Sequence, residues 1–196
     1  MKIGILGGTF DPPHLSHLAL AKQAIKKLQL DEVLFIPTWK TPLKSGKIIA
    51  TPEQRLKMLE LMIQNEPALS LSDIEITRRD ISYTIDTLSE LQAAYPAEYW
   101  LLMGSDAAIH FMDWKTPEKI ISLCRLGVSL RAPHSENQVL KPLSAIIKEK
   151  VDFIHGDIEP ISSTKIRNSL AEKIMPSHLL APDVVKYIQI QKLYKI

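Results

Sequence analysis

The stretch Gly4-Ile-Leu-Gly-Gly-Thr-Phe-Asp-Pro-Pro-His-Leu-Ser-His17 decides the fold expected for this chain. The apolar run Lys2–Leu6 predicts a strand, and Gly7-Gly8 predicts a tight turn directly after it. Glycine lets backbone amides approach a ligand closely, and a helix N-terminus presents unpaired N–H groups with partial positive charge. His14 and His17 share one face at the start of the next helix, where they can add donors to the same anion. The stretch therefore predicts a phosphate site.

The histidine pair allows two other interpretations. As metal ligands, His14 and His17 lack the glutamate of H-E-x-x-H and a third ligand at an obvious spacing. The pair could also do no more than cap the helix. The glycine turn matches neither G-x-G-x-x-G nor a P-loop, so no standard nucleotide motif explains it. Phosphate contact is the interpretation that the residues favour.

Composition, charge and cysteine count limit what kind of protein this chain can be. The 196 residues are 45% hydrophobic and 23% charged, as expected for one globular domain. Twenty-four basic residues against 22 acidic ones give a net charge of +2, which does not indicate a nucleic-acid partner. The single cysteine, Cys124, excludes an intrachain disulfide, and we expect it to be buried. There is neither an apolar run of the roughly 20 residues needed to cross a membrane nor a signal peptide, so we expect a cytoplasmic protein without a membrane partner.

Strand and helix patterns alternate along the chain. Strands are expected near Lys2–Leu6, Glu32–Pro37, Leu69–Thr77, Tyr99–Met103, Gly127–Arg131 and Val151–His155. Helices are expected over His14–Leu28, from Thr51 onward, and over Ser82–Ala94, Pro117–Cys124, Pro142–Lys150, Ser163–Glu172 and Pro182–Leu193. Repeated βα units predict an α/β fold with a doubly wound parallel sheet and helices on both faces. We expect a single domain over residues 1–196, with a helical C-terminal segment from about residue 160.

A second motif, Ile161-Ser-Ser-Thr-Lys-Ile-Arg167, follows the last expected strand and opens a helix. In open parallel sheets, ligands bind beyond the carboxyl ends of the strands, where the glycine turn is also expected. Thr164 and Arg167 are three residues apart, which puts the guanidinium on the face of the hydroxyl. Alone, the motif could be a helix cap. Beside the first motif, it predicts the second half of a phosphate site, because Arg suits phosphate oxygens.

Together the two motifs resemble those of the nucleotidyltransferase superfamily, whose signatures are T/H-x-G-H and I-S-S-T-x-I-R. More narrowly, the chain resembles the bacterial nicotinate-nucleotide adenylyltransferases. Further segments that agree are Thr51–Leu59, Glu75–Arg78, Ser82–Leu88, Met103–Asp106, Trp114, Leu180–Ile188 and Leu193-Tyr194. The resemblance covers nearly the full chain and implies a Rossmann-like nucleotidyltransferase fold.

The resemblance implies transfer of AMP from ATP to nicotinate mononucleotide, giving deamido-NAD and pyrophosphate in NAD biosynthesis. The catalytic residues it implies are His14, His17 and Arg167. The ATP-binding residues it implies are Gly7, Gly8, Thr9, Phe10, His14, His17, Asp106, Ile161, Ser163, Thr164 and Arg167. For nicotinate mononucleotide, the expected residues are Thr84, Trp114, Lys44 and Arg131.

The expected chemistry needs no base, because the nucleophile is already a phosphate anion. Catalysis can rest on in-line positioning and on neutralising charge at the phosphates. The expected cofactor is Mg²⁺ bound mainly through ATP oxygens, with no metal site made by the protein alone and no covalent intermediate. Oligomeric state is not specified by the sequence, and a homo-oligomer is compatible with it.

Two positions depart from the family pattern. Ser16 replaces the glycine of T/H-x-G-H, and a helix accepts serine with little expected loss. Leu43 stands where the family's Pro-Pro-His-Lys segment has histidine and supplies no imidazole for that contact, although Lys44 can still neutralise phosphate. Arg131 follows the fifth expected strand, where it could either contact a ligand or lie in solvent. His110, His134, His155 and His178 are expected to be surface or packing residues.

The sequence is also compatible with other functions. The acceptor could be nicotinamide mononucleotide or, more remotely, phosphopantetheine, and a cytidylyl reaction is a further variant. A protein of another class, a non-catalytic nucleotide sensor, would share the fold. Retention of His14, His17, Ser163, Thr164 and Arg167 counts against that alternative, since a binding relic should have lost some of them.

Overall fold

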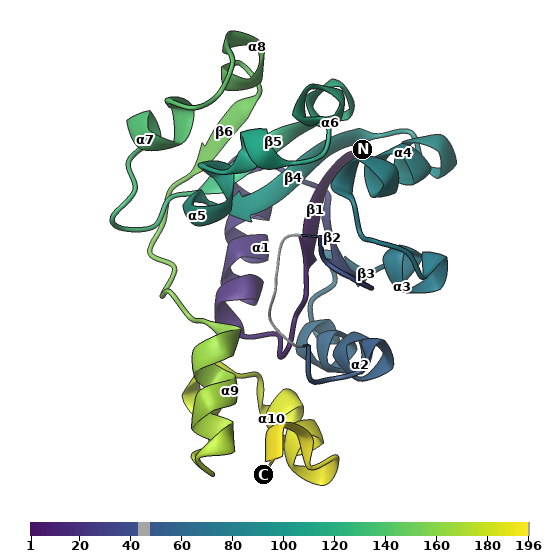
Figure 1. Ribbon diagram of the computed structural model, residues 1–196, viewed down its shortest axis with the longest axis vertical. Helices are drawn as coiled ribbons and strands as arrows, with labels where there is room; N and C mark the ends of the chain where they lie inside the picture. The colour runs from purple at the N-terminus through teal and green to yellow at the C-terminus, as the bar shows by residue number, and fades with distance from the viewer. Residues whose placement is uncertain (43–47, 196) are drawn as a thin grey trace.

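The structure is a computed structural model that describes residues 1–42 and 48–195, and these residues form one six-stranded, all-parallel sheet (Figure 1). Its strands are β1 (Lys2–Gly8), β2 (Glu32–Pro37), β3 (Leu69–Leu71), β4 (Glu98–Gly104), β5 (Cys124–Ser129) and β6 (Val151–Ile154). The strand order β3-β2-β1-β4-β5-β6 reverses direction between β1 and β4. Ligands bind at such a switch point in doubly wound folds, so the topology already indicates where a site belongs.

Helices cover both faces of this sheet. They are α1 (Leu15–Leu28), α2 (Pro52–Ile63), α3 (Ile74–Arg78), α4 (Thr84–Ala94), α5 (Ser105–Ala108), α6 (Pro117–Leu123), α7 (Glu136–Leu140), α8 (Ala145–Lys148), α9 (Ser163–Ala171) and α10 (Pro182–Ile190). Short 3₁₀ turns lie at Phe111–Asp113, Ser177–Leu179 and Leu193–Lys195. No helix in the described part of the chain is long and apolar enough to span a membrane.

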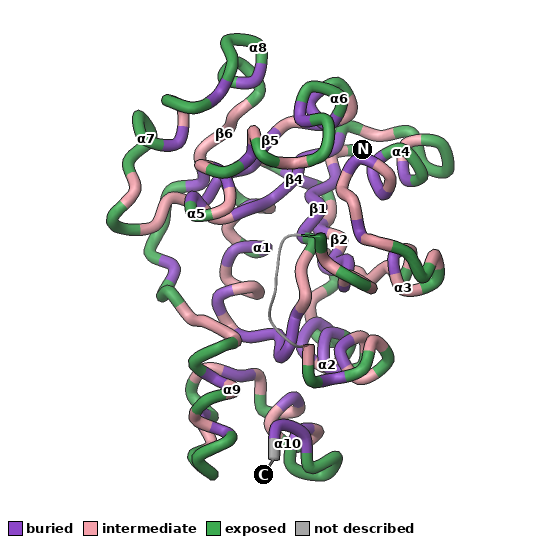
Figure 2. Tube along the Cα trace, in the orientation of Figure 1, coloured by how far each residue is buried: buried purple, intermediate pink, exposed green. Residues whose placement is uncertain are grey.

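Two apolar cores form because successive strand side chains point to opposite faces. Val33 and Phe35 belong to the core shared with α1, α2, α9 and α10, whereas Ile3 and Ile5 belong to the core shared with α4, α6, α7 and α8. Burial follows the sheet and the inward turns of the helices, and the outward turns are exposed (Figure 2). The expected doubly wound α/β fold is confirmed.

The first core also anchors the C-terminal helices. Ile166 and Leu170 of α9 and Val184 and Ile188 of α10 are buried in the same cluster as α1 and α2. In Figure 1, α9 and α10 lie beyond the carboxyl ends of the strands, at the opposite end of the molecule from α8. The chain from β6 therefore has to run back along the molecule before α9 begins.

Several expected boundaries were wrong. The strand expected over Leu69–Thr77 ends at Leu71, and α3 takes up its second half. Asp73 explains the change, because its carbonyl accepts from the Thr77 N–H at 2.8 Å and its carboxylate from the Thr77 hydroxyl at 3.0 Å. The alternation in Ile-Glu-Ile-Thr-Arg resembles a strand, but it lies on a helix whose Glu75 is buried.

Three further boundaries differ. β5 begins three residues earlier than expected, at Cys124, and ends at Ser129. The helix expected over Pro142–Lys150 is shortened to α8, and a further short helix, α7, precedes it where Ser135 forms a capping box with Gln138. The last helix stops at Ile190, since Lys192 and Tyr194 adopt positive φ angles of 50° and 63° that a right-handed helix cannot contain.

Candidate active site

The glycine turn after β1 is shaped by its neighbours. Gly8 packs on the ring of Phe10, and a Cβ at Gly8 would lie 3.2 Å from that ring. A Cβ at Gly7 would meet no described atom within 4 Å, so this side of the turn is open. Phe10 is buried and has a φ of 51°. This backbone conformation costs on the order of 1–3 kcal/mol, which the contacts around the loop have to offset. Strain of this kind often marks a functional loop.

The loop is held on both sides of Phe10. Arg55 of α2 donates from Nη1 to the Thr9 carbonyl at 2.8 Å and from Nη2 to the Thr38 carbonyl at 2.7 Å. Its side chain is buried, and this burial lowers the pKa of the guanidinium, an effect that nearby Asp11 opposes. Because arginine stays charged, Arg55 brings a fixed positive charge beneath the turn. No sequence pattern marks this residue, because its acceptors are backbone carbonyls.

Asp11 connects three distant segments. Its buried carboxylate accepts from the N–H groups of Ile49 and Ala50, at 2.8 and 3.1 Å, and from the Tyr194 hydroxyl at 2.7 Å. Burial and the nearby carboxylate raise the pKa of Tyr194, so that its hydroxyl stays protonated and can donate. With both oxygens engaged, Asp11 serves as a structural anchor for the loop.

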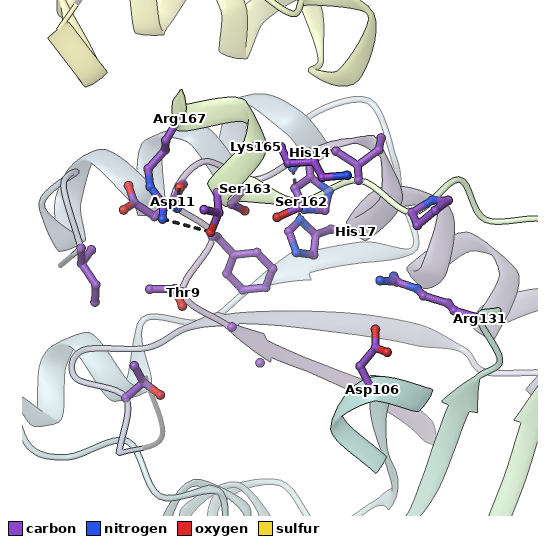
Figure 3. A pocket seen from close by; sticks show the side chains of 18 residues that line it. Thr9, Asp11, His14, His17, Asp106, Arg131, Ser162, Ser163, Lys165 and Arg167 are labelled. Carbon is purple, nitrogen blue, oxygen red and sulfur yellow. Dashed lines mark hydrogen bonds between the residues drawn. The ribbon is translucent and has the colours of Figure 1, made fainter. Parts of the chain in front are cut away.

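The two histidines begin α1 and stack on each other, with ring centroids 3.6 Å apart and an interplanar angle of 19°. The backbone N–H of His14 donates to Nδ1 of His17 at 3.2 Å. His17 Nδ1 is therefore an acceptor, so the ring proton resides on Nε2. His17 thus caps the helix through Nδ1 and carries an N–H donor at Nε2. The capping interpretation and the ligand interpretation of this side chain are therefore compatible. Figure 3 shows both rings at the wall of one pocket.

His14 is the more buried of the pair, with 4% of its surface exposed. Its Nδ1 has no hydrogen-bond partner among the described residues. Burial, followed by the positive charge of Arg131, lowers the pKa of His14 from 6.5 to about 4. The ring is therefore neutral at pH 7, and its buried Nδ1 is left without a partner among the described residues.

The second motif meets the first, as the sequence predicts. Ser163 donates from Oγ to the Pro12 carbonyl at 2.9 Å, across 151 positions of sequence. Arg167 donates from Nη1 to the Asp11 carbonyl at 2.8 Å and from Nη2 to the Thr164 hydroxyl at 3.2 Å. The expected alignment of Arg167 with Thr164 is confirmed. Together with Gly7, Gly8, Thr9, Phe10, His14, His17, Ile161 and Asp106, these motif residues line a cavity of about 810 Å³.

Asp106 and Arg131 face this cavity from the opposite side, from α5 and the end of β5 (Figure 3). His134 was expected to be a surface or packing residue. Instead, its Nδ1 lies 3.2 Å from the Asp106 carboxylate and 3.3 Å from the Ser105 hydroxyl. The partner of His134 is 28 positions away, so no local pattern could have revealed the contact.

A second cavity, of about 950 Å³, shares Gly7, Gly8, Thr9, His17, Thr41, Asp106 and Arg131 with the first. Thr84, the first residue of α4, and Trp114 line it, so the structure brings together three of the four residues expected for the acceptor. Lys115 lies beside them, with Nζ 4.1 Å from the centre of the Tyr83 ring and 3.2 Å from Asp86. Lys44 and Leu43 lie outside the described residues.

The described residues offer no clustered metal ligands and one cysteine, Cys124. Among residues 1–42 and 48–195, no three His, Cys, Asp or Glu side chains are grouped as they would be to hold a metal ion. Cys124 is buried, and burial raises the pKa of its thiol to about 12. A thiol with that pKa stays protonated and unreactive at neutral pH, as the sequence predicts.

Comparison with known proteins identifies the class. The model of the cytidylyltransferase-like family matches residues 5–169. A probable nicotinate-nucleotide adenylyltransferase of Dictyoglomus turgidum is 37% identical over 96% of this chain and 93% of its own length. One from Herpetosiphon aurantiacus is 38% identical over 98% of both chains. The chain therefore belongs to the cytidylyltransferase-like family, and within it to the nicotinate-nucleotide adenylyltransferases.

Solved structures agree on the fold. Nicotinic acid mononucleotide adenylyltransferase of Plasmodium falciparum, in complex with NaAD, superposes with a TM-score of 0.82, at 20% identity over 98% of this chain and 97% of that one. The same enzyme in complex with APC gives a TM-score of 0.80, at 20% identity over 98% and 96% of the two chains. The Rossmann-like nucleotidyltransferase fold and the family resemblance are both confirmed.

Proposed function

We propose that this enzyme transfers AMP from ATP to nicotinate mononucleotide, forming nicotinate adenine dinucleotide and pyrophosphate. The observation that carries the proposal is the convergence of His14, His17 and Arg167 on one cavity that shares a wall with a second. The second cavity has Thr84 and Trp114 in its lining. Two adjoining cavities suit a reaction between two nucleotides.

The triphosphate belongs in the first cavity. The N-termini of α1 and α9, Nε2–H of His17 and the guanidinium of Arg167 supply donors and positive charge to phosphate oxygens. His14 is neutral in the free protein, and an anion beside it would raise its pKa and strengthen its donation. Asp106 can accept hydrogen bonds from ribose hydroxyls at the other side of the cavity.

The reaction is a direct displacement at the α-phosphorus of ATP. A phosphate oxygen of the acceptor forms the new P–O bond, the bond to the β-phosphate oxygen breaks, and its electron pair leaves with pyrophosphate. The residues of the site hold the two nucleotides in line and stabilise the negative charge that develops on the leaving group. No side chain has to remove a proton from the acceptor phosphate, which is already ionised.

The acid acceptor fits the second cavity better than the amide. Thr84 begins an eleven-residue helix, whose first N–H groups have no partner within the helix and favour a carboxylate. Trp114 offers a flat indole face to a pyridine ring. A carboxamide gains less than a carboxylate from the partial positive charge at the helix N-terminus, so the geometry supports nicotinate over nicotinamide.

Magnesium fits this site as a companion of ATP. The Asp11 carboxylate is occupied by three hydrogen bonds, and Asp106 is the remaining carboxylate in the lining of the first cavity. This donor set suits Mg²⁺ held mainly by triphosphate oxygens and water. When bound, the ion would neutralise charge on the phosphates.

Pyrophosphate release tests the proposal. The purified protein is given ATP and Mg²⁺ with nicotinate mononucleotide, nicotinamide mononucleotide, phosphopantetheine or no acceptor, and ATP binding is measured separately by calorimetry. We expect release that depends on nicotinate mononucleotide. Binding of ATP without turnover of any acceptor would replace the proposal with the nucleotide-sensor alternative, and turnover of another acceptor alone would reassign the second cavity.

A further inference from the structure

The connection between β6 and α9 determines where the second motif lies. It begins after Ile154, runs back along the molecule (Figure 1), and is exposed at Glu159 and Pro160. Ile161, at its end, lines the first cavity two residues before Ser163. A shift of this connection would therefore be passed directly to the start of α9.

Ser16 holds this connection from α1. It is the second residue of that helix, and its side chain is buried, with 2% of the residue exposed. Its hydroxyl donates to the Glu159 carbonyl and accepts from the Ile161 N–H at 3.1 Å. Both capacities of one hydroxyl are thus used on the two sides of Pro160, a residue that has no N–H of its own.

The position of Ser16 makes this contact unusual. Serine inside a helix commonly bonds a carbonyl one turn earlier, but the second helical residue has no such carbonyl in the helix. The family signature has glycine here, which supplies no side chain. This chain therefore holds its connection with two hydrogen bonds that the signature residue cannot make, whereas the sequence alone predicted only that a helix would accept the serine.

Ser16 also differs from the other contacts that hold α9. Arg167 binds the Asp11 carbonyl with the guanidinium that the proposed function assigns to phosphate, and Ser163, which binds the Pro12 carbonyl, opens the helix whose N-terminus is assigned to phosphate. These two contacts therefore belong to residues that ATP would also engage. Ser16 uses no group assigned to the ligand, so its two bonds remain when ATP binds.

We propose that Ser16 is a positioning residue for ATP, which fixes the start of α9 relative to His17 through the backbone of Glu159 and Ile161. The role rests on the proposed function, since it assigns α9 to the triphosphate. Ser16 and His17 are consecutive on α1, so the same turn of helix carries one half of the phosphate site and anchors the other.

The test compares Ser16→Ala with Ser129→Ala. Ser129 is a matched control, because it is fully buried and its hydroxyl has no hydrogen-bond partner among the described residues. Amide hydrogen exchange at Ile161 is followed by NMR, and the Kd for ATP is measured by calorimetry without an acceptor. In Ser16→Ala we expect exchange at Ile161 to accelerate at least tenfold and the Kd for ATP to rise about fivefold. Amides of β1 and the KM for nicotinate mononucleotide should stay unchanged.

Ser16→Gly provides a second variant that carries the family residue and is expected to fold. It should show the same faster exchange at Ile161 and the same weaker ATP binding, while Ser129→Ala shows neither. The positioning role is overturned if amide exchange at Ile161 is unchanged in both Ser16 variants. It is also overturned if exchange becomes faster in both variants while the Kd for ATP stays the same. Because neither readout needs turnover, an inactive protein that still showed both effects would contradict the proposed function and leave the role of Ser16 standing.

Discussion

His14 and His17 show how neighbours give two identical side chains different states. His17 has its tautomer fixed by the N–H of His14, while His14 is neutral through burial and the charge of Arg131. The two rings stack with their centroids 3.6 Å apart and line the same cavity. On the proposed function, His17 combines helix capping with donation to phosphate, and His14 becomes a stronger donor when the anion binds.

His17→Asn separates the two roles of His17. Asn Oδ1 occupies the place of Nδ1 and can still accept from the His14 N–H, but the donor at Nε2 is lost. We expect kcat/KM to fall at least about 10²-fold, the loss typical of one charge-stabilising donor, while stability to urea changes by less than about 1 kcal/mol. Steady-state kinetics and urea unfolding check this. A wild-type rate would remove His17 from the catalytic residues.

His14 predicts how stability depends on pH. Its pKa is lowered in the folded protein from 6.5 to about 4, so between these values the unfolded chain binds a proton that the folded chain does not. The associated stability is therefore present above pH 6.5 and is lost as the pH falls towards 4, by at most about 3 kcal/mol. In His14→Gln this part of the acid dependence should disappear.

Urea unfolding at pH 7 and pH 4.5 measures the effect. His178→Gln serves as the control, because His178 is exposed and its replacement should leave the acid dependence as in the wild type. An equal loss of stability in wild type and His14→Gln would show that His14 is not the group that takes up the proton.

At the scale of elements, helices outside the sheet hold the loop after β1 in its strained form. Arg55 of α2 binds Thr9 on one side of Phe10, and Arg167 of α9 binds Asp11 on the other. The loop is thus clamped by two helices that belong to the same apolar core as α1. Rigid elements on both sides keep its N–H groups preorganised for an anion.

Arg55→Met should show what the clamp contributes. The methionine fills similar space but leaves the partly buried carbonyls of Thr9 and Thr38 without their donor, which costs about 2–4 kcal/mol of unfolding free energy. Lys57→Met, on the same helix but exposed and paired with Glu60, should change stability by less than about 1 kcal/mol. Denaturant unfolding compares the two variants, and equal losses would deny Arg55 its role as a clamp.

At the scale of the whole molecule, the C-terminal segment packs against the loop that follows β1. The Tyr194 hydroxyl and the Asp11 carboxylate are 183 positions apart in sequence and 2.7 Å apart in space. Because both are buried, Tyr194→Phe should destabilise the protein by about 1–3 kcal/mol and raise the KM for ATP. Tyr95→Phe removes a hydroxyl from an exposed tyrosine and should do neither. Thermal unfolding and kinetics distinguish these results, and equal behaviour of the two variants would contradict the anchoring role.

The sequence predicts the sheet well because its central strands carry long apolar runs. β1, β2 and β4 are buried on both faces, and their runs match the observed strands closely. The edge strand β3 has one partner strand and only three residues, so local hydrogen bonds of Asp73 override the alternation beyond it. Short helices such as α7 and α8 depend on local caps, which make their limits hard to predict.

The candidate site divides in the same way. His14, His17, Ser163, Thr164 and Arg167 stand in compact motifs next to strand ends, so topology alone brings them together. Arg55, Tyr194 and His134 act on backbone carbonyls or on side chains far away in sequence, and no periodicity records such contacts. The hydrogen bond from the Ile161 N–H to Ser16 likewise depends on the path of the chain after β6, which the sequence does not reveal.

The most direct test of the central claim offers both acceptors at once. The protein is incubated with ATP, Mg²⁺ and equal concentrations of nicotinate mononucleotide and nicotinamide mononucleotide, and the dinucleotides formed are quantified by mass spectrometry. The arrangement of Thr84 and Trp114 predicts that the nicotinate dinucleotide dominates by at least about tenfold, the ratio that about 1.4 kcal/mol of extra stabilisation gives. Predominance of the nicotinamide dinucleotide, or the absence of both products, would contradict it.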